Sequence, residues 1–400
     1  MRASSRSTVP LLRWPTPVSL RPVELLFDYR PALRTRSGVG EYVHELLAAL
    51  ADPPESGERL HLFTSSWKDR LQPSALSSLP GVTAHDARVP VHLLNWAWHR
   101  LGWPSVERVA GGHFDVVHAA HPLLIPARGA RVVTVHDLDF LDHPERTSAE
   151  IRRDYAPLVR AHAHRADAIV AVSQHTRDQV IERLGVTPDR VSIVRAGVPR
   201  WAREGRRRPR DPGGPILFVG TVEPRKNLST LLDAYQILIG DRRDVPPLDV
   251  IGRVTEAGAP LVERVTRKPL LGRVRFHGYV SEADRRAAYE RASVLVLPSW
   301  HEGFGLPALE AMALGVPVVA ARRGALVEVI GDSGALVEPN RPDQFADALR
   351  LLLDDRAVAD EMAMRGTIRA QGFSWARAAA AARQVYRAAI ERAGEHAHRH

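Results

Sequence analysis

The chain of 400 residues contains no cysteine. Disulfide bonds, thiolate metal sites and a cysteine nucleophile are therefore excluded, although this absence does not identify the compartment. The first twenty residues are interrupted by Pro10, Pro15 and Pro17, and no apolar stretch reaches the length of a signal peptide or a membrane-spanning helix. The default expectation is a cytoplasmic protein in which residues 1–18 form a disordered tail.

Lysine is also scarce, since only Lys68, Lys226 and Lys268 occur among many arginines. The formal net charge is nevertheless +9, and 44% of the residues are hydrophobic. This composition indicates a folded globular protein, with nucleic acid, an anionic membrane or phosphorylated ligands as candidate partners. The basic excess is spread over both halves and no nucleic-acid-binding module stands out, so nucleic acid is not expected. The densest basic run, within residues 200–210, favours a solvated linker over a membrane-surface patch.

Short apolar runs alternate with longer helical patterns along the chain. The first series of predicted strands covers residues 23–27, 60–63, 115–117, 131–135 and 168–172. Predicted helices in this half cover residues 41–50, 148–165 and 173–184. The second series of predicted strands covers residues 216–219, 248–251, 274–276, 294–297 and 316–320. This alternation predicts an α/β protein with two Rossmann-like, doubly wound parallel sheets.

We therefore expect a first domain over residues 19–200, a linker over 201–214 and a second domain over 215–374. An Ala-rich amphipathic helix over residues 375–392 is expected to cross back onto the first domain. Two domains of this size imply a cleft between them, and ligands of such sheets bind beyond the carboxyl ends of the strands.

The most informative segment is 298–312, which runs from a predicted strand through a turn into a helix. Gly303 and Gly305 allow a ligand to approach the backbone closely. Free amides at the start of such a helix can bind a diphosphate. Glu302 and Glu310 can point toward the same cleft, where one could hold sugar hydroxyls and the other a ribose. The structural alternative is that the acidic side chains only complement the helix dipole.

A second turn follows the strand 216–219 and begins at Gly220. A lysine retained beside Arg225 in an arginine-rich chain suggests that a point charge is needed at Lys226. Together the two cations could neutralise the phosphates of a departing nucleoside diphosphate. Taken alone, this run would be interpreted as a solvated turn.

Two segments of the first half also follow predicted strands. His136 comes directly after the strand 131–135, which would place it across the cleft from Glu302, although a lone histidine is more often structural. Gly38 and Gly40 resemble a dinucleotide-binding fingerprint, but Val43 stands where its third glycine would be. As evidence for a dehydrogenase, this match is weak.

The two glutamates separated by seven residues, Glu302 and Glu310, resemble the signature of retaining glycosyltransferase family 4, whose members have the GT-B fold. The resemblance covers both predicted domains and is strongest in the second. It implies that Glu302 contacts the transferred sugar and that Glu310 binds the nucleotide ribose. It also implies that backbone amides hold hydroxyls and phosphate at Phe304, Gly305 and Leu306.

By the same resemblance, Arg225 and Lys226 hold the diphosphate and His136 lies near the reaction centre. The backbone around Val280 contacts the base, and Gly220 belongs to the donor site. Gly38 and Gly40 lie in a loop over the donor phosphates. Candidates for acceptor binding around this loop are Asp28, Tyr29, Arg30 and Arg36.

The reaction implied by the resemblance is a metal-independent transfer with retention by front-face attack, in which the leaving phosphate accepts the proton of the acceptor. A double displacement would need a carboxylate nucleophile with an acid/base partner, and no such pair is evident. No bound cofactor is expected. The expected donor is GDP-mannose, with a UDP-hexose as the alternative. The acceptor could be a glycan, a lipid-linked oligosaccharide or a small alcohol, and the basic surface favours a lipid-bound one with peripheral membrane contact.

Two other functional classes remain open at this point. One is a sugar-nucleotide epimerase on the same fold, and the other is a catalytically silent basic binding protein. Three groups of residues are interpreted as structural or solvated rather than functional. They are the pair His118 and His121, which lacks a partner at metal-ligand spacing, the tail residues His396, His398 and His400, and the tryptophans Trp96, Trp98 and Trp103. For the tryptophans, the alternative to packing is an acceptor-binding or membrane surface.

Overall fold

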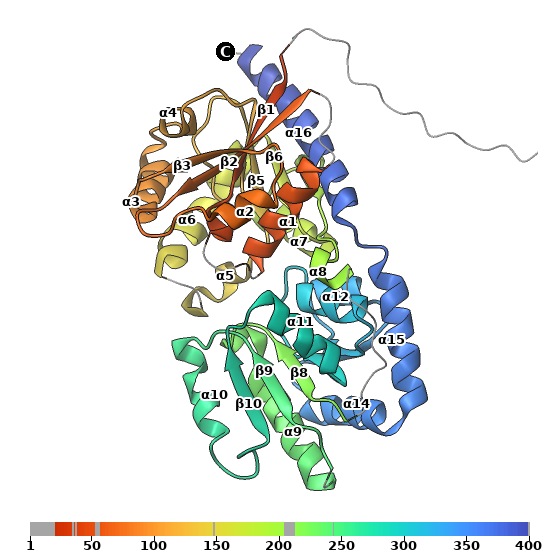
Figure 1. Cartoon of the computed structure of the whole chain (residues 1–400). Coiled ribbons are helices and arrows are strands. Elements are labelled where there is room, and N and C mark those ends of the chain that lie inside the picture. The colour runs from red at the N-terminus through yellow and green to blue at the C-terminus, as the bar shows by residue number, and fades with distance from the viewer. Residues whose placement is uncertain are drawn as a thin grey trace, which may run out of the picture.

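The computed structural model describes residues 21–398, apart from 34–35, 37, 53–56, 147–148, 204–212 and 243. The tail predicted over 1–18 and most of the predicted linker therefore lie outside the described residues. Two parallel β-sheets, each flanked by helices, form the two halves of the molecule (Figure 1). None of the helices in the described part of the chain is long and apolar enough to cross a bilayer.

The first sheet has seven parallel strands in the order β3-β2-β1-β4-β5-β6-β7. Both faces of the sheet are buried: Leu25 and Phe27 face the core beneath α1 and α16, whereas Leu26 faces the core on the other side. Because both faces are buried, the central strands consist of short runs of apolar residues in the sequence. The strands are β1 (Val23–Asp28), β2 (Glu58–Ser65), β3 (Thr83–Ala87), β4 (Val116–Ala119), β5 (Ala130–Val135), β6 (Ala168–Ala171) and β7 (Val191–Ile193).

The second sheet has six parallel strands in the order β10-β9-β8-β11-β12-β13. Its central strands are completely buried and consist almost entirely of Val, Leu, Ile and Phe. The strands are β8 (Ile216–Val219), β9 (Leu248–Ile251), β10 (Val274–Gly278), β11 (Val294–Leu297), β12 (Val318–Ala321) and β13 (Ala335–Val337).

Helices connect successive strands in both halves, except between β4 and β5, and local sequence sets the ends of the helices. The side chain of Ser173 accepts a hydrogen bond from the Thr176 amide at the start of α7, and Gly185 ends that helix in the left-handed conformation. The helices of the first half are α1 (Val39–Ala51), α2 (Pro73–Ser77), α3 (Val91–Trp96), α4 (Val106–Ala110), α5 (Asp139–Asp142), α6 (Ala149–Arg165) and α7 (Gln174–Leu184). Those of the second half are α9 (Leu228–Asp241), α10 (Ala259–Arg264), α11 (Glu282–Arg291), α12 (Leu306–Ala313), α13 (Ala325–Ile330), α14 (Pro342–Asp354) and α15 (Arg356–Ala370).

Shorter helical turns lie between these elements. A turn of π-helix, η2 (Ala97–Leu101), continues α3. The 3-10 turns are η1 (Arg30–Ala32), η3 (Pro144–Arg146), η4 (Pro188–Arg190), η5 (Pro224–Lys226) and η6 (Glu256–Gly258).

The chain passes between the two halves at two places that touch. It first enters the second half before α8 (Arg200–Arg203), which contacts α11 and α12. It returns where α16 (Trp375–His398) begins. A Cβ atom on Gly197 would lie 2.3 Å from the backbone nitrogen of Trp375, and the Val198 amide donates to the Phe373 carbonyl at 3.3 Å. The two crossings therefore pack directly against each other.

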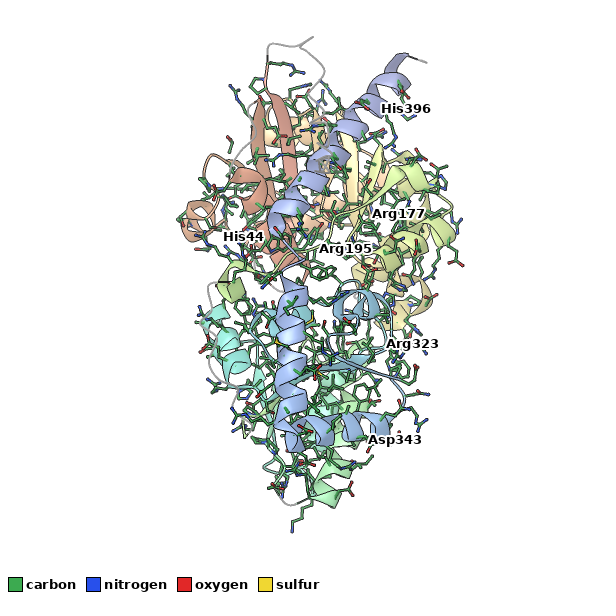
Figure 2. The ribbon with its side chains drawn as sticks, turned by 90° about the vertical axis from the view of Figure 1, so that its right-hand side faces the viewer. His44, Arg177, Arg195, Arg323, Asp343 and His396 are labelled. Atoms are coloured by element: carbon green, nitrogen blue, oxygen red, sulfur yellow. The ribbon has the colours of Figure 1, made fainter. Side chains whose placement is uncertain are left out.

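Helix α16 lies along the first sheet beside α1, and His396 is near its far end (Figures 1 and 2). Arg383 of α16 donates to Glu58 at 3.0 Å and to the Leu50 carbonyl at 2.9 Å. Residues 201–203, which the sequence assigns to a linker, end helix α8 instead. Trp201 is buried there and stacks on Tyr289 with ring centroids 6.0 Å apart.

Candidate functional site

The candidate site lies where the strand order of the second sheet reverses, between β8 and β11. Arg225 and Lys226 follow β8, and Glu302 follows β11. The two segments are joined because the Trp300 amide donates to the Arg225 carbonyl at 2.9 Å. A reversal of strand order leaves a crevice beyond the carboxyl ends of the strands, where such sheets bind their ligands.

Lys226 and Glu302 form a bidentate ion pair. The ammonium nitrogen lies 2.6 and 2.7 Å from the two carboxylate oxygens, and the Ser299 hydroxyl donates to the same carboxylate at 2.8 Å. Burial alone would raise the pKa of Glu302, but Lys226 and Arg225 outweigh burial and hold the pKa below its usual value. Glu302 is therefore ionised at neutral pH.

Arg225 carries a second fixed positive charge at this position. Its guanidinium donates to Glu223 at 2.9 Å and to the His301 carbonyl at 3.1 Å, and lies 3.7 Å from Asp137 of the first half. Burial would lower the pKa of Arg225, but Asp137, Glu302 and Glu223 outweigh it and raise the pKa above its usual value. Both cations are thus held by carboxylates.

Gly303 lies at a tight contact between the two halves. A Cβ atom on Gly303 would lie 1.9 Å from the carbonyl oxygen of His136. The Thr176 hydroxyl lies 3.3 Å from this oxygen and 3.4 Å from the Gly303 carbonyl. The sequence predicted that Gly303 lets a ligand approach the backbone closely. Gly303 does line the cavity described below, and its missing side chain also makes room for the backbone of His136.

His136 lines the cleft directly behind this contact. Its Nε2 lies 3.2 Å from the Ala120 carbonyl, and its ring meets the edge of Tyr42 at 5.2 Å between centroids. Burial lowers the pKa of His136 to about 4, with Asp137 partly opposing the shift. The imidazole is therefore neutral at pH 7 and acts there through hydrogen bonds rather than charge.

The start of α12 presents free backbone amides to the same space. Gly305 has φ of 96°, a left-handed conformation that favours glycine, and precedes Leu306, the first residue of the helix. Within the described residues, the amides of Gly305 and Leu306 have no hydrogen-bond acceptor. Phe304 is buried against Phe373, which anchors the turn. The turn can therefore receive an anion.

Glu310 lies one turn further along α12. It is 2% exposed and accepts a hydrogen bond from the Tyr289 hydroxyl at 2.7 Å. Arg285 lies 3.7 Å from its other oxygen. Burial raises the pKa of Glu310 despite both neighbours.

Two adjoining cavities bring these residues together. The first, of about 340 Å³, lies between the halves, and the second, of about 620 Å³, extends along the ends of β8, β9 and β10. Both are lined by Glu41, Gly220 and Arg285. Predicted site residues that line the first cavity are Gly38, His136, Gly220, Arg225, Lys226, Glu302, Phe304, Gly305, Leu306 and Glu310. Val280 lines the second, whereas Gly40 lies within α1 and lines neither.

Similarity to known proteins identifies the family to which this chain belongs. Residues 36–200 match the family described as Glycosyltransferase Family 4, and residues 214–355 match the one described as Glycosyl transferases group 1. The chain is 30% identical over 376 residues to O-antigen chain mannosyltransferase B of Escherichia coli, which covers 88% of this chain and 96% of the relative. The chain belongs to glycosyltransferase family 4.

The chain is also similar to a second curated protein in sequence and to a solved structure in fold. Glycogen synthase of Mycobacterium tuberculosis is 28% identical over 404 residues, with 92% of this chain and 95% of the relative covered. The solved structure of sucrose-phosphate synthase from Thermosynechococcus elongatus has a TM-score of 0.70 at 22% identity, covering 91% of this chain and 98% of that one. The two facing sheets are the GT-B fold, as predicted, and the protein is a glycosyltransferase. The epimerase and the silent binding protein are thereby disfavoured.

Several candidates in the amino-terminal half of this family 4 enzyme lie away from the cleft surface. Asp28 and Tyr29 are buried, and Arg30 pairs with Asp28 at 2.7 Å while its own side chain is only 7% exposed. Asp28 and Tyr29 line neither of the two cavities, whereas Arg30 lines a third one, of about 530 Å³, together with Trp67 and Lys68. Arg36 does line the second cavity. His118 is buried between Tyr386 and Thr134, which agrees with a structural role.

The three tryptophans do not behave alike. Trp98 is buried, as a packing role predicts, but Trp96 and Trp103 are 51% and 59% exposed. The packing interpretation is therefore wrong for these two: Trp96 ends α3 on its exposed side, and Trp103 lies in the loop that follows η2. His121 is mostly buried near Asp28, and His396 at the end of α16 is 66% exposed. Among the described residues, no group of three or more His, Asp or Glu side chains could hold a metal ion.

Sequence reasoning missed two residues of the cleft. Glu41 directly follows the glycine turn, and Arg285 lies on α11 after the segment that contains Val280. Only their proximity to recognised motifs could have drawn attention to them.

Proposed function

We propose that this enzyme is a retaining mannosyltransferase that uses GDP-mannose and needs neither a metal ion nor a bound cofactor. The observation that carries the proposal is the joint position of Arg225, Lys226 and the amides of Gly305 and Leu306 around one cavity. Cations and helix amides at one point are suited to the negative charge that develops on a leaving diphosphate.

Glu302 provides the complementary group for the sugar. Its carboxylate stays ionised and can accept hydrogen bonds from sugar hydroxyls, while Lys226 can turn from it toward a phosphate. Front-face attack then requires no protein nucleophile, because the leaving phosphate oxygen takes the proton of the acceptor hydroxyl as the new glycosidic bond forms. His136, being neutral, serves as a hydrogen-bonding partner near the reacting carbon.

Two observations support GDP-mannose as the donor. The relative at 30% identity is named a mannosyltransferase. In addition, Glu282 lines the second cavity next to Tyr279 and Val280. A carboxylate can accept hydrogen bonds from both the ring N–H and the exocyclic amine of guanine, whereas uracil offers a single N–H between two carbonyl oxygens. A UDP-hexose is the alternative donor.

A lipid-linked acceptor at the inner face of the cytoplasmic membrane is supported by an exposed apolar stripe. Leu93, Trp96 and Leu101 on α3 and η2 are 54%, 51% and 60% exposed, and Trp67 nearby is 71% exposed. Large apolar side chains gathered on a surface indicate an interaction site, and tryptophan with basic residues is typical of the membrane interface. The exposed Lys68 borders a cavity of about 530 Å³ next to this stripe.

The experiment that tests this function measures thermal stabilisation and turnover with a panel of nucleotide sugars. GDP and GDP-mannose are expected to raise the melting temperature most, because a ligand that binds only the folded state stabilises it. The anomeric configuration of the product, determined by NMR, should equal that of the donor. Stabilisation by UDP-sugars alone would overturn the donor, an inverted product would overturn retention, and no response to any nucleotide sugar would overturn the function.

A further inference from the structure

Glu41 is a buried carboxylate of the first domain that faces the donor cavity. It lies on α1 directly after the glycine turn, is 2% exposed and lines both cavities. Its Oε1 is 3.6 Å from Arg285, and its Oε2 has no hydrogen-bond partner among the described residues. An acceptor oxygen that is buried and unpaired in this way needs an explanation.

Arg285 joins this carboxylate to Glu310 of the second domain. One terminal nitrogen of the guanidinium lies 3.6 Å from Glu41, and the other lies 3.7 Å from Glu310. The guanidinium packs over the ring of Trp201 at 4.9 Å, and its Nε is also buried without a partner in the described chain. Two carboxylates from opposite domains therefore share one guanidinium at distances longer than a hydrogen bond.

The carboxylate of Glu41 is only weakly stabilised by its ion pair with Arg285. Burial raises the pKa of Glu41 to about 7, and Glu310 adds to the shift while Arg285 opposes it. Leaving a buried polar atom unpaired costs about 1–3 kcal/mol. In contrast, the Tyr289 hydroxyl donates to Glu310 at 2.7 Å, so close pairing is possible in this region. The unpaired Oε2 of Glu41 and the long contacts of Arg285 with Glu41 and Glu310 point to a ligand that supplies hydroxyl groups.

We propose that Glu41 is a second ribose-binding carboxylate, which accepts a hydrogen bond from one hydroxyl of the donor nucleotide while Glu310 accepts one from the other. Arg285 holds both carboxylates in position. This inference rests on the proposed function, since it requires a nucleoside diphosphate in the cleft. Because the two carboxylates belong to different domains, one ribose links the domains directly.

Calorimetric titration of GDP and of 2′,3′-dideoxy-GDP tests this role. The wild-type protein should bind GDP more tightly than the dideoxy nucleotide. Glu41→Ala should weaken GDP binding about tenfold and leave dideoxy-GDP nearly unchanged, because a ribose hydroxyl left without its partner costs about 1–3 kcal/mol. Glu45→Ala is the matched control, since Glu45 lies one turn along the same helix outside both cavities.

The results distinguish a failure of the proposed role of Glu41 from a failure of the proposed function. Equal weakening of both nucleotides by Glu41→Ala, or no weakening, overturns the role of Glu41 while nucleotide binding itself stands. If wild-type protein binds neither GDP nor UDP, the proposed function has failed instead. Should Glu41→Ala not fold, Glu41→Gln keeps the size of the side chain, and it must show the same selective loss for GDP in smaller degree. If a UDP-sugar is the donor, UDP and its dideoxy analogue replace the guanine pair.

Discussion

Lys226 and Glu302 lie 76 positions apart in the sequence, yet the ammonium nitrogen of one is within 2.7 Å of both carboxylate oxygens of the other. This contact explains why a lysine persists among so many arginines, since a compact charge on a flexible stem can turn between two partners. One partner is Glu302, and we propose that a donor phosphate takes its place in the complex.

Lys226→Ala is expected to lower kcat by about 10²–10³-fold, which is the loss typical of removing one group that stabilises developing negative charge. The free energy of unfolding should also fall, by up to about 3 kcal/mol, because Glu302 is left buried beside Arg225 at 4.0 Å. Initial rates and chemical denaturation measure the two effects. Lys268→Ala, at an exposed lysine, should change neither. Unchanged turnover in Lys226→Ala would remove the residue from the mechanism.

Gly303→Ala is expected to abolish most activity, because the new methyl group would meet the His136 carbonyl at 1.9 Å and force the domains apart. The fold of each domain should survive, so circular dichroism should remain that of the wild type while donor binding weakens at least tenfold. Gly240→Ala on α9 is the control, since its added methyl group meets no atom within 4 Å. That change should stabilise the protein by about 0.5–1 kcal/mol. Full activity in Gly303→Ala would show that the contact does not set the cleft geometry.

Acidification is expected to destabilise the protein between pH 6.5 and pH 4. Burial lowers the pKa of six histidines to between about 3 and about 4, namely His44, His99, His118, His121, His136 and His162. Below pH 6.5 these histidines bind protons in the unfolded chain but remain neutral in the folded protein. Each of them can therefore lower the free energy of unfolding by up to about 1.4 kcal/mol per pH unit. Glu41, Glu45 and Glu310 act in the opposite direction because their pKa values are raised, but they are fewer.

Denaturant unfolding at pH 7.5 and pH 5.0 measures this dependence. The free energy of unfolding should be lower at pH 5.0 by several kcal/mol in total. His44→Gln removes one of the titrating groups and should reduce the difference. A stability that is equal at both pH values would contradict the neutral state of these histidines.

Glu328→Ala is expected to loosen the closed arrangement of the domains. The Glu328 carboxylate accepts hydrogen bonds from the Gln174 amide at 2.9 Å and from the His175 amide at 3.3 Å, at the start of α7 in the other domain. Bonds to a charged group contribute about 1.5–3 kcal/mol, so the apparent Kd for donor should rise about tenfold as the competent state becomes rarer. Small-angle scattering should show a larger radius of gyration. Glu338→Ala, whose ion pair with Arg322 stays within one domain, should leave both measurements unchanged.

Replacing Leu93 and Trp96 together by serine is expected to weaken binding to phosphatidylglycerol vesicles about tenfold per side chain, because each loses about 1.5 kcal/mol or more of apolar burial. Co-sedimentation measures the bound fraction. Ile368→Ser serves as the control, since Ile368 is 61% exposed on α15 of the other domain. Equal binding of all variants, or no binding of the wild type, would contradict membrane contact through this stripe.

The central strands were predictable because burial on both faces leaves an unmistakable apolar run. Residues 216–219, 248–251 and 294–297 were predicted as strands, and they are β8, β9 and β11 with the same bounds. Prediction failed for β3, β7 and β13, each of which lies at an edge of its sheet. Strand β3 reads Thr-Ala-His-Asp-Ala, because a partly exposed edge strand tolerates polar side chains.

Part of the candidate site was also predictable, because several of its residues come directly after buried strands. Arg225, Lys226 and Glu302 each follow a buried strand, and parallel strands bring their carboxyl ends to one edge, so these residues line one cavity. Their catalytic roles remain predictions. Glu41 and Arg285 escaped notice because a charged residue on a helix has no local pattern that shows whether it faces solvent or an opposing domain. The pairing of Gly303 with His136 likewise depends on how two separately folded sheets face each other.

The contact of Gly197 with Trp375 has a mechanical consequence. Both covalent connections between the lobes pass through this one spot, so rotation of one lobe against the other can occur about a single pivot without bending either sheet. A methyl group at position 197 would meet the backbone of Trp375 and push the two connections apart, which would change the angle between the lobes before it changed the fold of either one.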